Sequence, residues 1–181
     1  ASNMVATIGG GSYPITVEGS ETLNVSYKTA YYYLLTNKTI EAYSNSGKKI
    51  FSYNHGFENP VLKTSKTRAL VFGQNTNQAL IFNLKGLATS LEVKENIKNA
   101  AIGDNGTYAL VTSSGNYAAQ VSVYKKNGDL LYEWFSSKDL VNNVAVSPNG
   151  KKIAVSTLDS AVGTYNSKLS VLGFSSATPE Y

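Results

Sequence analysis

The chain has 181 residues and a formal net charge of +4, and its 42% hydrophobic and 15% charged content is typical of a globular domain. It contains no cysteine, which excludes disulfides, thiolate metal sites and cysteine nucleophiles, and its single histidine excludes a histidine-rich metal site. No apolar run approaches the length that a transmembrane helix needs. The lack of cysteine leaves the redox compartment undecided.

The first residues are small and polar, with three consecutive glycines, and we interpret residues 1–12 as an N-terminal tail or linker. The glycine run is too short for a phosphate-binding loop and lacks the lysine of one. Residues 13–181 follow as one predicted repeat domain.

In this domain a unit of about forty residues, built only of strand-like runs, recurs four times, at approximately 20–58, 59–96, 97–140 and 141–176. The first runs lie at 22–26, 60–64, 99–103 and 143–147, and we align the second runs at 34–36, 70–72, 110–112 and 154–156. The third runs carry the pairs 42–43, 81–82, 123–124 and 171–172. Apolar residues in these runs alternate with Ser, Thr, Asn and Lys, which indicates β-strands.

A glycine follows the third run of the first three units and opens a tight turn into a fourth run. These glycines are Gly47, Gly86 and Gly128, and the fourth runs are 48–53, 87–93 and 129–135. Glycine supplies the positive φ that a tight hairpin needs. Two further turn-forming sequences, 104–106 (Asp-Asn-Gly) and 147–150 (Ser-Pro-Asn-Gly), separate the first and second runs of the later units.

This repeat predicts an all-β, β-propeller-like fold of about four blades, each a four-stranded antiparallel sheet. A helical period over residues 91–101 is the competing local pattern, and the repeat favours a strand, a loop and a strand there. The fourth unit stops after its third run, so residues 5–8 or 13–17 are candidates for its outer strand. We expect a partial propeller, either a fragment of a longer one or an open four-blade arc. Its open blade edges could pair two copies into a homodimer.

Three lysine pairs, at 48–49, 125–126 and 151–152, lie in or beside predicted hairpin turns, and we interpret them as solvated. Nucleic-acid binding would need clustered Arg and Lys beside stacking aromatics, and Arg68 is the only arginine, so we do not expect it. A weak attraction to an anionic cell wall or membrane surface stays open.

His55 lies in a predicted inter-blade loop, where it could act as an acid or base, but no recognisable motif places Ser or a carboxylate beside it. The aspartates are scattered singly and form no calcium-binding loop: Asp104, Asp129, Asp139 and Asp159. A structural ion held by loop carbonyls stays open. We therefore assign no catalytic residue, no metal ligand and no cofactor, and the ligand-binding residues are unknown.

Tyrosine is used in excess and crowds the first unit, at positions 27, 31, 32, 33, 43 and 53. Tyr31, Tyr32 and Tyr33 must alternate between the faces of a strand, so one or two could be exposed while the others pack between blades. Exposed tyrosines beside Asn could bind a sugar or a partner protein, and packing between neighbouring sheets is the interpretation that we favour. Trp134 and Phe135, on a predicted outer strand, have the same two interpretations.

Four segments, at 59–62, 97–111, 117–128 and 144–156, resemble uncharacterised, membrane-anchored, propeller-like proteins of Firmicutes, with repeats of the WD40 or quinoprotein type. The resemblance extends over residues 13–174. It implies an extracytoplasmic, truncated ectodomain at the surface of a Gram-positive bacterium, anchored in the full-length protein by an N-terminal helix, and it brings no known activity. Tryptophan-rich quinone-docking repeats do not occur here, nor do the Gly-His and Trp-Asp pairs of eukaryotic WD repeats.

These observations favour a non-catalytic extracytoplasmic interaction module that binds a protein or a cell-surface glycan. One alternative is a fragment of a propeller hydrolase or lyase whose active site lies in missing blades. Such a site would need histidines and carboxylates gathered from several blades, and this chain supplies one histidine. The other alternative is a structural spacer, for which we would expect neither a cleft nor an exposed aromatic group.

Overall fold

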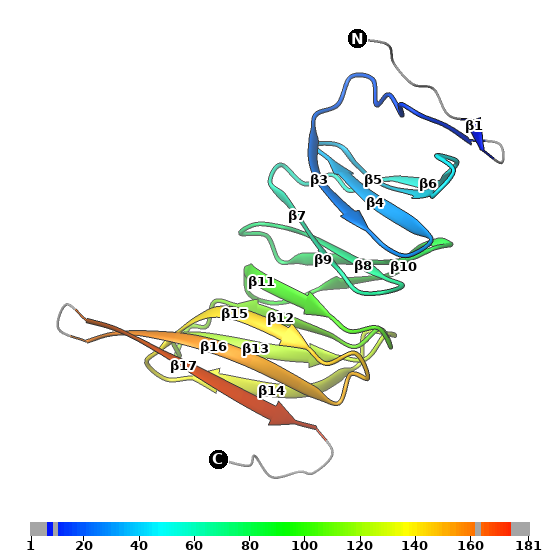
Figure 1. The fold of residues 1–181 in the computed structure, drawn as a ribbon. Coiled ribbons are helices and arrows are strands. Elements are labelled where there is room, and N and C mark those ends of the chain that lie inside the picture. Colours follow the sequence, from blue (N-terminus) through cyan, green and yellow to red (C-terminus); the bar gives the residue numbers. More distant parts are fainter. Residues whose placement is uncertain (1–6, 9–10, 162–163, 175–181) are drawn as a thin grey trace.

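The structure, a computed structural model, describes residues 7–8, 11–161 and 164–174. Figure 1 shows antiparallel sheets that follow one another in chain order, with the N-terminal sheet at one end of the row and the C-terminal sheet at the other. The described residues form strands and turns, and none of them belongs to a helix that could cross a membrane. The prediction of an all-β, propeller-like fold is confirmed. We call the four main sheets blades and the row that they form the arc.

Each blade is a meander whose strands pair in chain order. The first blade comprises β3 (Thr22–Tyr27), β4 (Tyr31–Thr36), β5 (Thr39–Ser44) and β6 (Lys49–Asn54). The second comprises β7 (Pro60–Thr64), β8 (Ala69–Gly73), β9 (Gln78–Asn83) and β10 (Gly86–Glu92). The third comprises β11 (Ile97–Ile102), β12 (Tyr108–Thr112), β13 (Ala119–Tyr124) and β14 (Leu130–Ser136). The fourth comprises β15 (Leu140–Val146), β16 (Lys152–Ala161) and β17 (Thr164–Gly173), and a small hairpin of β1 (Thr7–Ile8) and β2 (Gly11–Ser12) precedes the arc.

The turns into the outer strands have the chemistry that the sequence predicts. Gly47, Gly86 and Gly128 have φ angles of 81°, 109° and 94°, which residues with a Cβ atom rarely adopt. The alternative helix over residues 91–101 is absent, because β10 ends at Glu92 and β11 begins at Ile97. The repeat therefore predicts local structure here better than the helical period does.

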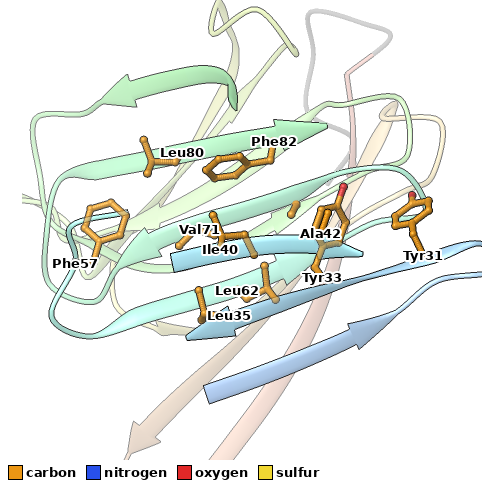
Figure 2. Close-up of a cluster of buried hydrophobic side chains, with 11 residues drawn as sticks. Tyr31, Tyr33, Leu35, Ile40, Ala42, Phe57, Leu62, Val71, Leu80 and Phe82 are labelled. Carbon is orange, nitrogen blue, oxygen red and sulfur yellow. The ribbon is translucent and has the colours of Figure 1, made fainter. Parts of the chain in front are cut away.

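Three hydrophobic clusters fill the spaces between successive blades. Figure 2 shows the first cluster, in which Tyr33 and Ile40 of the first blade pack with Val71 and Phe82 of the second. The second cluster joins the second and third blades, and the third cluster joins the third and fourth. Because the inner blades are buried on both faces, their central strands read as continuous apolar runs.

The orientation of these side chains corrects the predicted alignment of the second strands. Leu35 belongs to the first cluster and Leu34 does not, so Leu34 faces away from the second blade. In β8, Val71 faces back toward the first blade and Leu70 faces the third. Val71 is therefore the residue equivalent to Leu34, and Val155 takes this place in the fourth blade. The predicted alignment is wrong by one residue in these two blades, because a run that is apolar on both faces looks the same after a one-residue slip.

The fourth blade has three strands within the described residues, as its shortened repeat predicts. The proposed donors of a fourth strand lie elsewhere. Strand β1 pairs with β2, and residues 13–17 form no strand but lie across the first blade. There Tyr13 accepts a hydrogen bond from the Tyr32 hydroxyl at 2.8 Å and donates one to the Asn45 backbone oxygen at 2.9 Å. The expectation that residues 13–17 fill the fourth blade is wrong, and residues 5–6 lie outside the described residues.

Candidate binding groove between the second and third blades

A groove of about 500 Å³ lies between the second and third blades. One wall is the end of β10 with the loop that follows it, residues 91–95, and the loop at 114–117 adds to the lining. The other wall is formed by β13 and β14. On β13 the groove is lined by Gln120 and Ser122, because Val121 and Val123 alternate with them and pack toward the fourth blade. Strand alternation thus presents polar side chains to the groove and leaves the valines to the core.

Two exposed aromatic side chains line the groove. The ring centroids of Tyr117 and Phe135 are 4.8 Å apart with an interplanar angle of 40°, and the residues stay 46% and 41% exposed. Tyr117 comes from the loop before β13, and Phe135 comes from the outer strand β14. The neighbouring Trp134 instead packs against the third hydrophobic cluster. Of the two predicted aromatic candidates on this strand, one therefore serves the core and the other is available to a partner.

A carboxylate is held beside this aromatic pair. The Glu133 Oε1 atom accepts a hydrogen bond from Gln120 Nε2 at 2.6 Å and another from Ser122 Oγ at 3.3 Å. Neither bond uses Oε2, which can therefore accept a hydrogen bond from a ligand. The rest of the charged lining consists of two glutamates and one lysine: Glu92, Glu95 and Lys94. The groove thus has a formal charge of −2 in a chain whose net charge is +4.

The tyrosines of the first blade divide between its two faces, as strand alternation predicts. Tyr31 and Tyr33 are buried in the first hydrophobic cluster, with ring centroids 5.6 Å apart in an edge-to-face arrangement. Tyr32 points to the opposite face and stacks on Tyr43 at 5.8 Å. Tyr27 is largely exposed. Packing between blades accounts for Tyr31 and Tyr33, and Tyr27 stays accessible.

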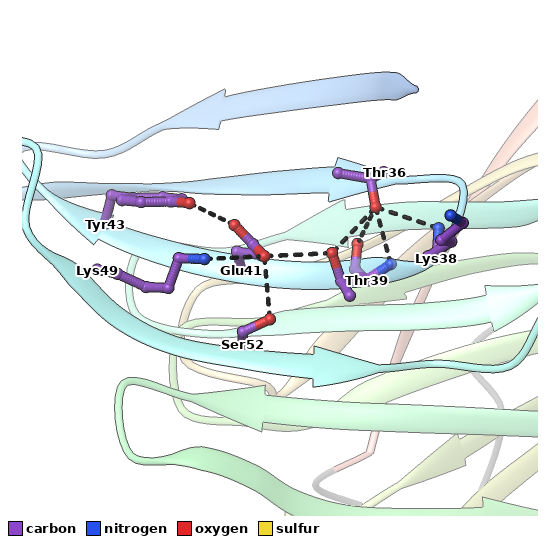
Figure 3. A network of polar contacts seen from close by, with 7 residues as sticks. All are labelled: Thr36, Lys38, Thr39, Glu41, Tyr43, Lys49 and Ser52. Atoms are coloured by element: carbon purple, nitrogen blue, oxygen red, sulfur yellow. Dashed lines mark hydrogen bonds and ion pairs between the residues drawn. The ribbon is translucent and has the colours of Figure 1, made fainter. Parts of the chain in front are cut away.

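Figure 3 shows a polar network on the first blade that the sequence does not reveal. The buried Glu41 carboxylate accepts hydrogen bonds from the Tyr43 hydroxyl, from Ser52 Oγ at 3.0 Å and from Lys49 Nζ at 3.2 Å. Burial raises the pKa of Glu41, but these hydrogen bonds and the Lys49 charge outweigh burial and hold the pKa below its ordinary value. Because its oxygens are already engaged, this carboxylate stabilises the sheet. Lys49 is accordingly part of an ion pair, which the solvated-turn interpretation missed.

His55 is buried, and both ring nitrogens are engaged. Nδ1 accepts a hydrogen bond from the Phe57 backbone N–H at 3.0 Å, so the proton is on Nε2, which donates to the Thr36 backbone oxygen at 3.0 Å. The imidazole also stacks on the Phe57 ring at 5.8 Å. His55 therefore fastens the inter-blade loop to β4, and this geometry supports a structural role in place of acid–base chemistry.

The scattered aspartates do not come together. Asp104 accepts a hydrogen bond from the Lys66 backbone N–H at 2.6 Å, which links the turns of the third and second blades. Asp139 forms an ion pair with Lys168 at 3.6 Å. Across the part of the chain that the structure describes, no three His, Asp or Glu side chains gather in a metal-binding arrangement.

Sequence reasoning identified Phe135 as a candidate but missed Tyr117, Gln120 and Glu133. These residues come from a loop and two strands, and only the blade geometry brings them together. The available signal was the pair of polar residues at alternate positions in the otherwise apolar β13.

The sequence profile of a family of unknown function, DUF5711, matches residues 12–180. The chain belongs to this family. This confirms the coarser part of the predicted resemblance, a domain of unknown function with propeller-like repeats. No curated protein matches the chain.

Solved structures share the fold at low sequence identity. Kluyveromyces lactis Hsv2p is 15% identical with a TM-score of 0.63, over 87% of this chain and 50% of that one. The WD40 domain of Neurospora crassa Pan2 is 14% identical with a TM-score of 0.57, over 87% of this chain and 50% of that one. A eukaryotic initiation factor is 14% identical with a TM-score of 0.60, over 88% of this chain and 41% of that one. This DUF5711 chain therefore spans half or less of each of these solved chains and shares the β-propeller architecture with them.

Proposed function

We propose that this DUF5711 chain is a non-catalytic, extracytoplasmic interaction module that binds a partner protein in the groove between its second and third blades. The observation that carries the proposal is the exposed pair of Tyr117 and Phe135 beside the oriented Glu133 carboxylate. Aromatic side chains dominate the binding energy of protein interfaces, because they bury a large area at a low cost in conformational entropy.

The charge of the groove favours a partner segment that carries lysine or arginine. The lining carries a formal charge of −2, while the chain as a whole carries +4. An ammonium or guanidinium group could contact the ring faces of Tyr117 and Phe135 and donate to Glu133 Oε2. Propeller folds serve many functions, so the fold supports the proposal by analogy alone.

A cell-surface glycan is the second candidate occupant. Tyr117 and Phe135 offer stacking surfaces, and the amide of Gln120 and the Glu133 carboxylate offer hydrogen-bonding groups for hydroxyls. The two occupants differ in charge, so salt separates them: binding of a basic peptide weakens as ionic strength rises, whereas binding of a neutral glycan does not.

A random peptide library displayed on phage tests the proposal, with purified Gram-positive cell walls as a second probe in a sedimentation assay. We expect the wild-type chain to enrich peptides with basic residues. The Tyr117→Ala/Phe135→Ala variant should not enrich them. Leu131→Ala is the matched control, since Leu131 is an exposed apolar residue of the same strand outside the groove. Glu133→Gln should weaken peptide binding and flatten its salt dependence.

Other outcomes of these assays would count against a protein partner. Wall binding that depends on Tyr117 and Phe135, without peptide enrichment, would favour the glycan. No binding to either probe would favour the structural spacer. Hydrolysis of wall material by the wild-type chain would favour the enzyme fragment.

The extracytoplasmic position and the membrane anchor in a longer protein are proposals that rest on the resemblance to Firmicutes proteins. An antibody against this chain, applied to fractionated cells of the organism that encodes it, tests them. We expect the antigen in the membrane or cell-wall fraction and its digestion by protease added to intact cells. An antigen found only in the cytosolic fraction would overturn both.

A further inference from the structure

The two ends of the arc each expose a sheet face that corresponds to a buried face elsewhere in the molecule. Each blade has a leading face, turned to the next blade, and a trailing face, turned to the previous one. In the described residues, no blade covers the trailing face of the first blade or the leading face of the fourth (Figure 1).

The trailing face of the first blade keeps an apolar residue at a position that the other blades bury. Val25 pairs with Leu34, and the equivalent pairs in the other blades place Leu62, Ala100 and Val144 at the same position. Those three residues are 7%, 1% and 6% exposed, whereas Val25 is 57% exposed. Tyr27, two residues further along the same face, is also largely exposed.

The leading face of the fourth blade has the same property. Val171 is equivalent to Ala42, Ile81 and Val123 on the third strands of the other blades, and those three residues are 0% exposed. Val171 is 56% exposed. Leu169, on the same face of β17, is exposed as well. Each end therefore has the side chains of an inter-blade contact without the blade that would complete it.

The path of the N-terminal segment is compatible with such a contact. The inter-blade contacts involve mainly the innermost strands: β11 contacts β7 and β8, and β15 contacts β11 and β12. Residues 13–17 cover the first blade near Tyr32 and leave β3, its innermost strand, uncovered. Between this segment and β3 lies an apolar groove of about 430 Å³, lined by residues that include Ile15, Val17 and Val25.

We propose that a second copy of this chain covers both faces, with the leading face of each fourth blade packed on the trailing face of the other copy's first blade. The two contacts are then identical, and a twofold rotation closes the pair into one ring of blades. The repeat supports a second copy as the partner, because Val171 of one copy and Val25 of the other are equivalent to residues that are buried between successive blades.

Analytical ultracentrifugation of the purified chain, and of variants that carry a charged residue in place of a valine at either end, tests this pairing. We expect the wild-type chain to have the mass of two chains, and Val25→Lys and Val171→Glu each to have the mass of one. When the two variants are mixed, the mass of two chains should return, since one contact is then unaltered and the other joins the introduced lysine to the introduced glutamate. Leu130→Lys is the control, because Leu130 is similarly exposed on the outer strand of the third blade and should leave the pair intact.

Circular dichroism would show that each variant is folded, which is expected because the substituted positions are solvent-exposed in the single chain. A wild-type chain that stays a monomer at its highest soluble concentration would overturn the proposal. So would single variants that keep the mass of two chains, or assemblies that grow beyond two chains as the concentration rises.

Discussion

Gly150→Ala is expected to lower the free energy of unfolding by more than a backbone effect explains, because Gly150 lies where the turns of the third and fourth blades meet. Its φ is 66°, and a Cβ atom there would overlap the side chains of Asn105 and Thr107. Asn105 is not free to move aside. Its Nδ2 donates to the Asn149 backbone oxygen at 2.9 Å, and its Oδ1 accepts from the Thr107 backbone N–H at 2.9 Å.

The magnitude follows from these contacts. Left-handed backbone in an alanine costs about 1 kcal/mol, and displacing Asn105 loses two hydrogen bonds of about 1 kcal/mol each, for a total of about 3 kcal/mol. Gly56→Ala is the matched control, since Gly56 has a φ of 71° and a Cβ atom added there would meet no atom within 4 Å. That variant should lose only the backbone contribution, about 1 kcal/mol.

Urea denaturation followed by tryptophan fluorescence measures the difference. Trp134 is the only tryptophan of the chain and packs against the cluster between the third and fourth blades, the two blades whose turns meet at Gly150. In an Asn105→Ala/Thr107→Ala background, the Gly150→Ala change should cost only about 1 kcal/mol, because both overlapping side chains are gone. Equal losses for Gly150→Ala and Gly56→Ala, within about 0.5 kcal/mol, would refute this account of the inter-blade contact.

Phe82→Ala should lower the free energy of unfolding by about 4 kcal/mol, because the ring is fully buried in the first cluster. Phe135 is exposed, so Phe135→Ala should change it by only about 0.5 kcal/mol. Similar losses for the two variants in urea denaturation would contradict this. Glu41 has a pKa below its ordinary 4.5, so its contribution to stability is present above that pH and is lost on further acidification. Stability curves of the wild type and Glu41→Gln should therefore converge as the pH falls, and parallel curves would argue against the network. Burial raises the pKa of Tyr33 and Tyr108 above the ordinary 10.0, so stability should fall as the pH rises past that value, and a flat alkaline melting profile would disprove it.

The blade repeat and its turns could be predicted from the sequence because they depend on local chemistry. Gly47, Gly86 and Gly128 stand where the backbone needs positive φ, and the structure has positive φ at all three. The third strands also align as predicted, because in the first three blades a glycine stands four residues after the aromatic residue of each one. The second strands lack such a marker and are apolar on both faces, which is why their alignment slipped by one residue.

Candidate residues were harder to place because their roles depend on what packs against them. Phe135 and Trp134 are neighbours in sequence and could not be distinguished, yet strand alternation puts one ring in the groove and the other in the core. The structural role of His55 depends on the backbones of Thr36 and Phe57, which lie beside its two ring nitrogens only in the folded chain.

The number of blades, the strand order within each blade and the turns that join the strands could be predicted from the sequence alone. These follow from a period of two, from glycine and from contacts between neighbours in the chain. Three other features depend on packing in the folded chain: which face of each strand meets the next blade, where residues 13–17 lie and which side chains line the groove. Those outcomes depend on contacts between residues that are distant in sequence, from 13 positions for Gln120 and Glu133 to about forty between successive blades, and a single sequence carries no local signal for them.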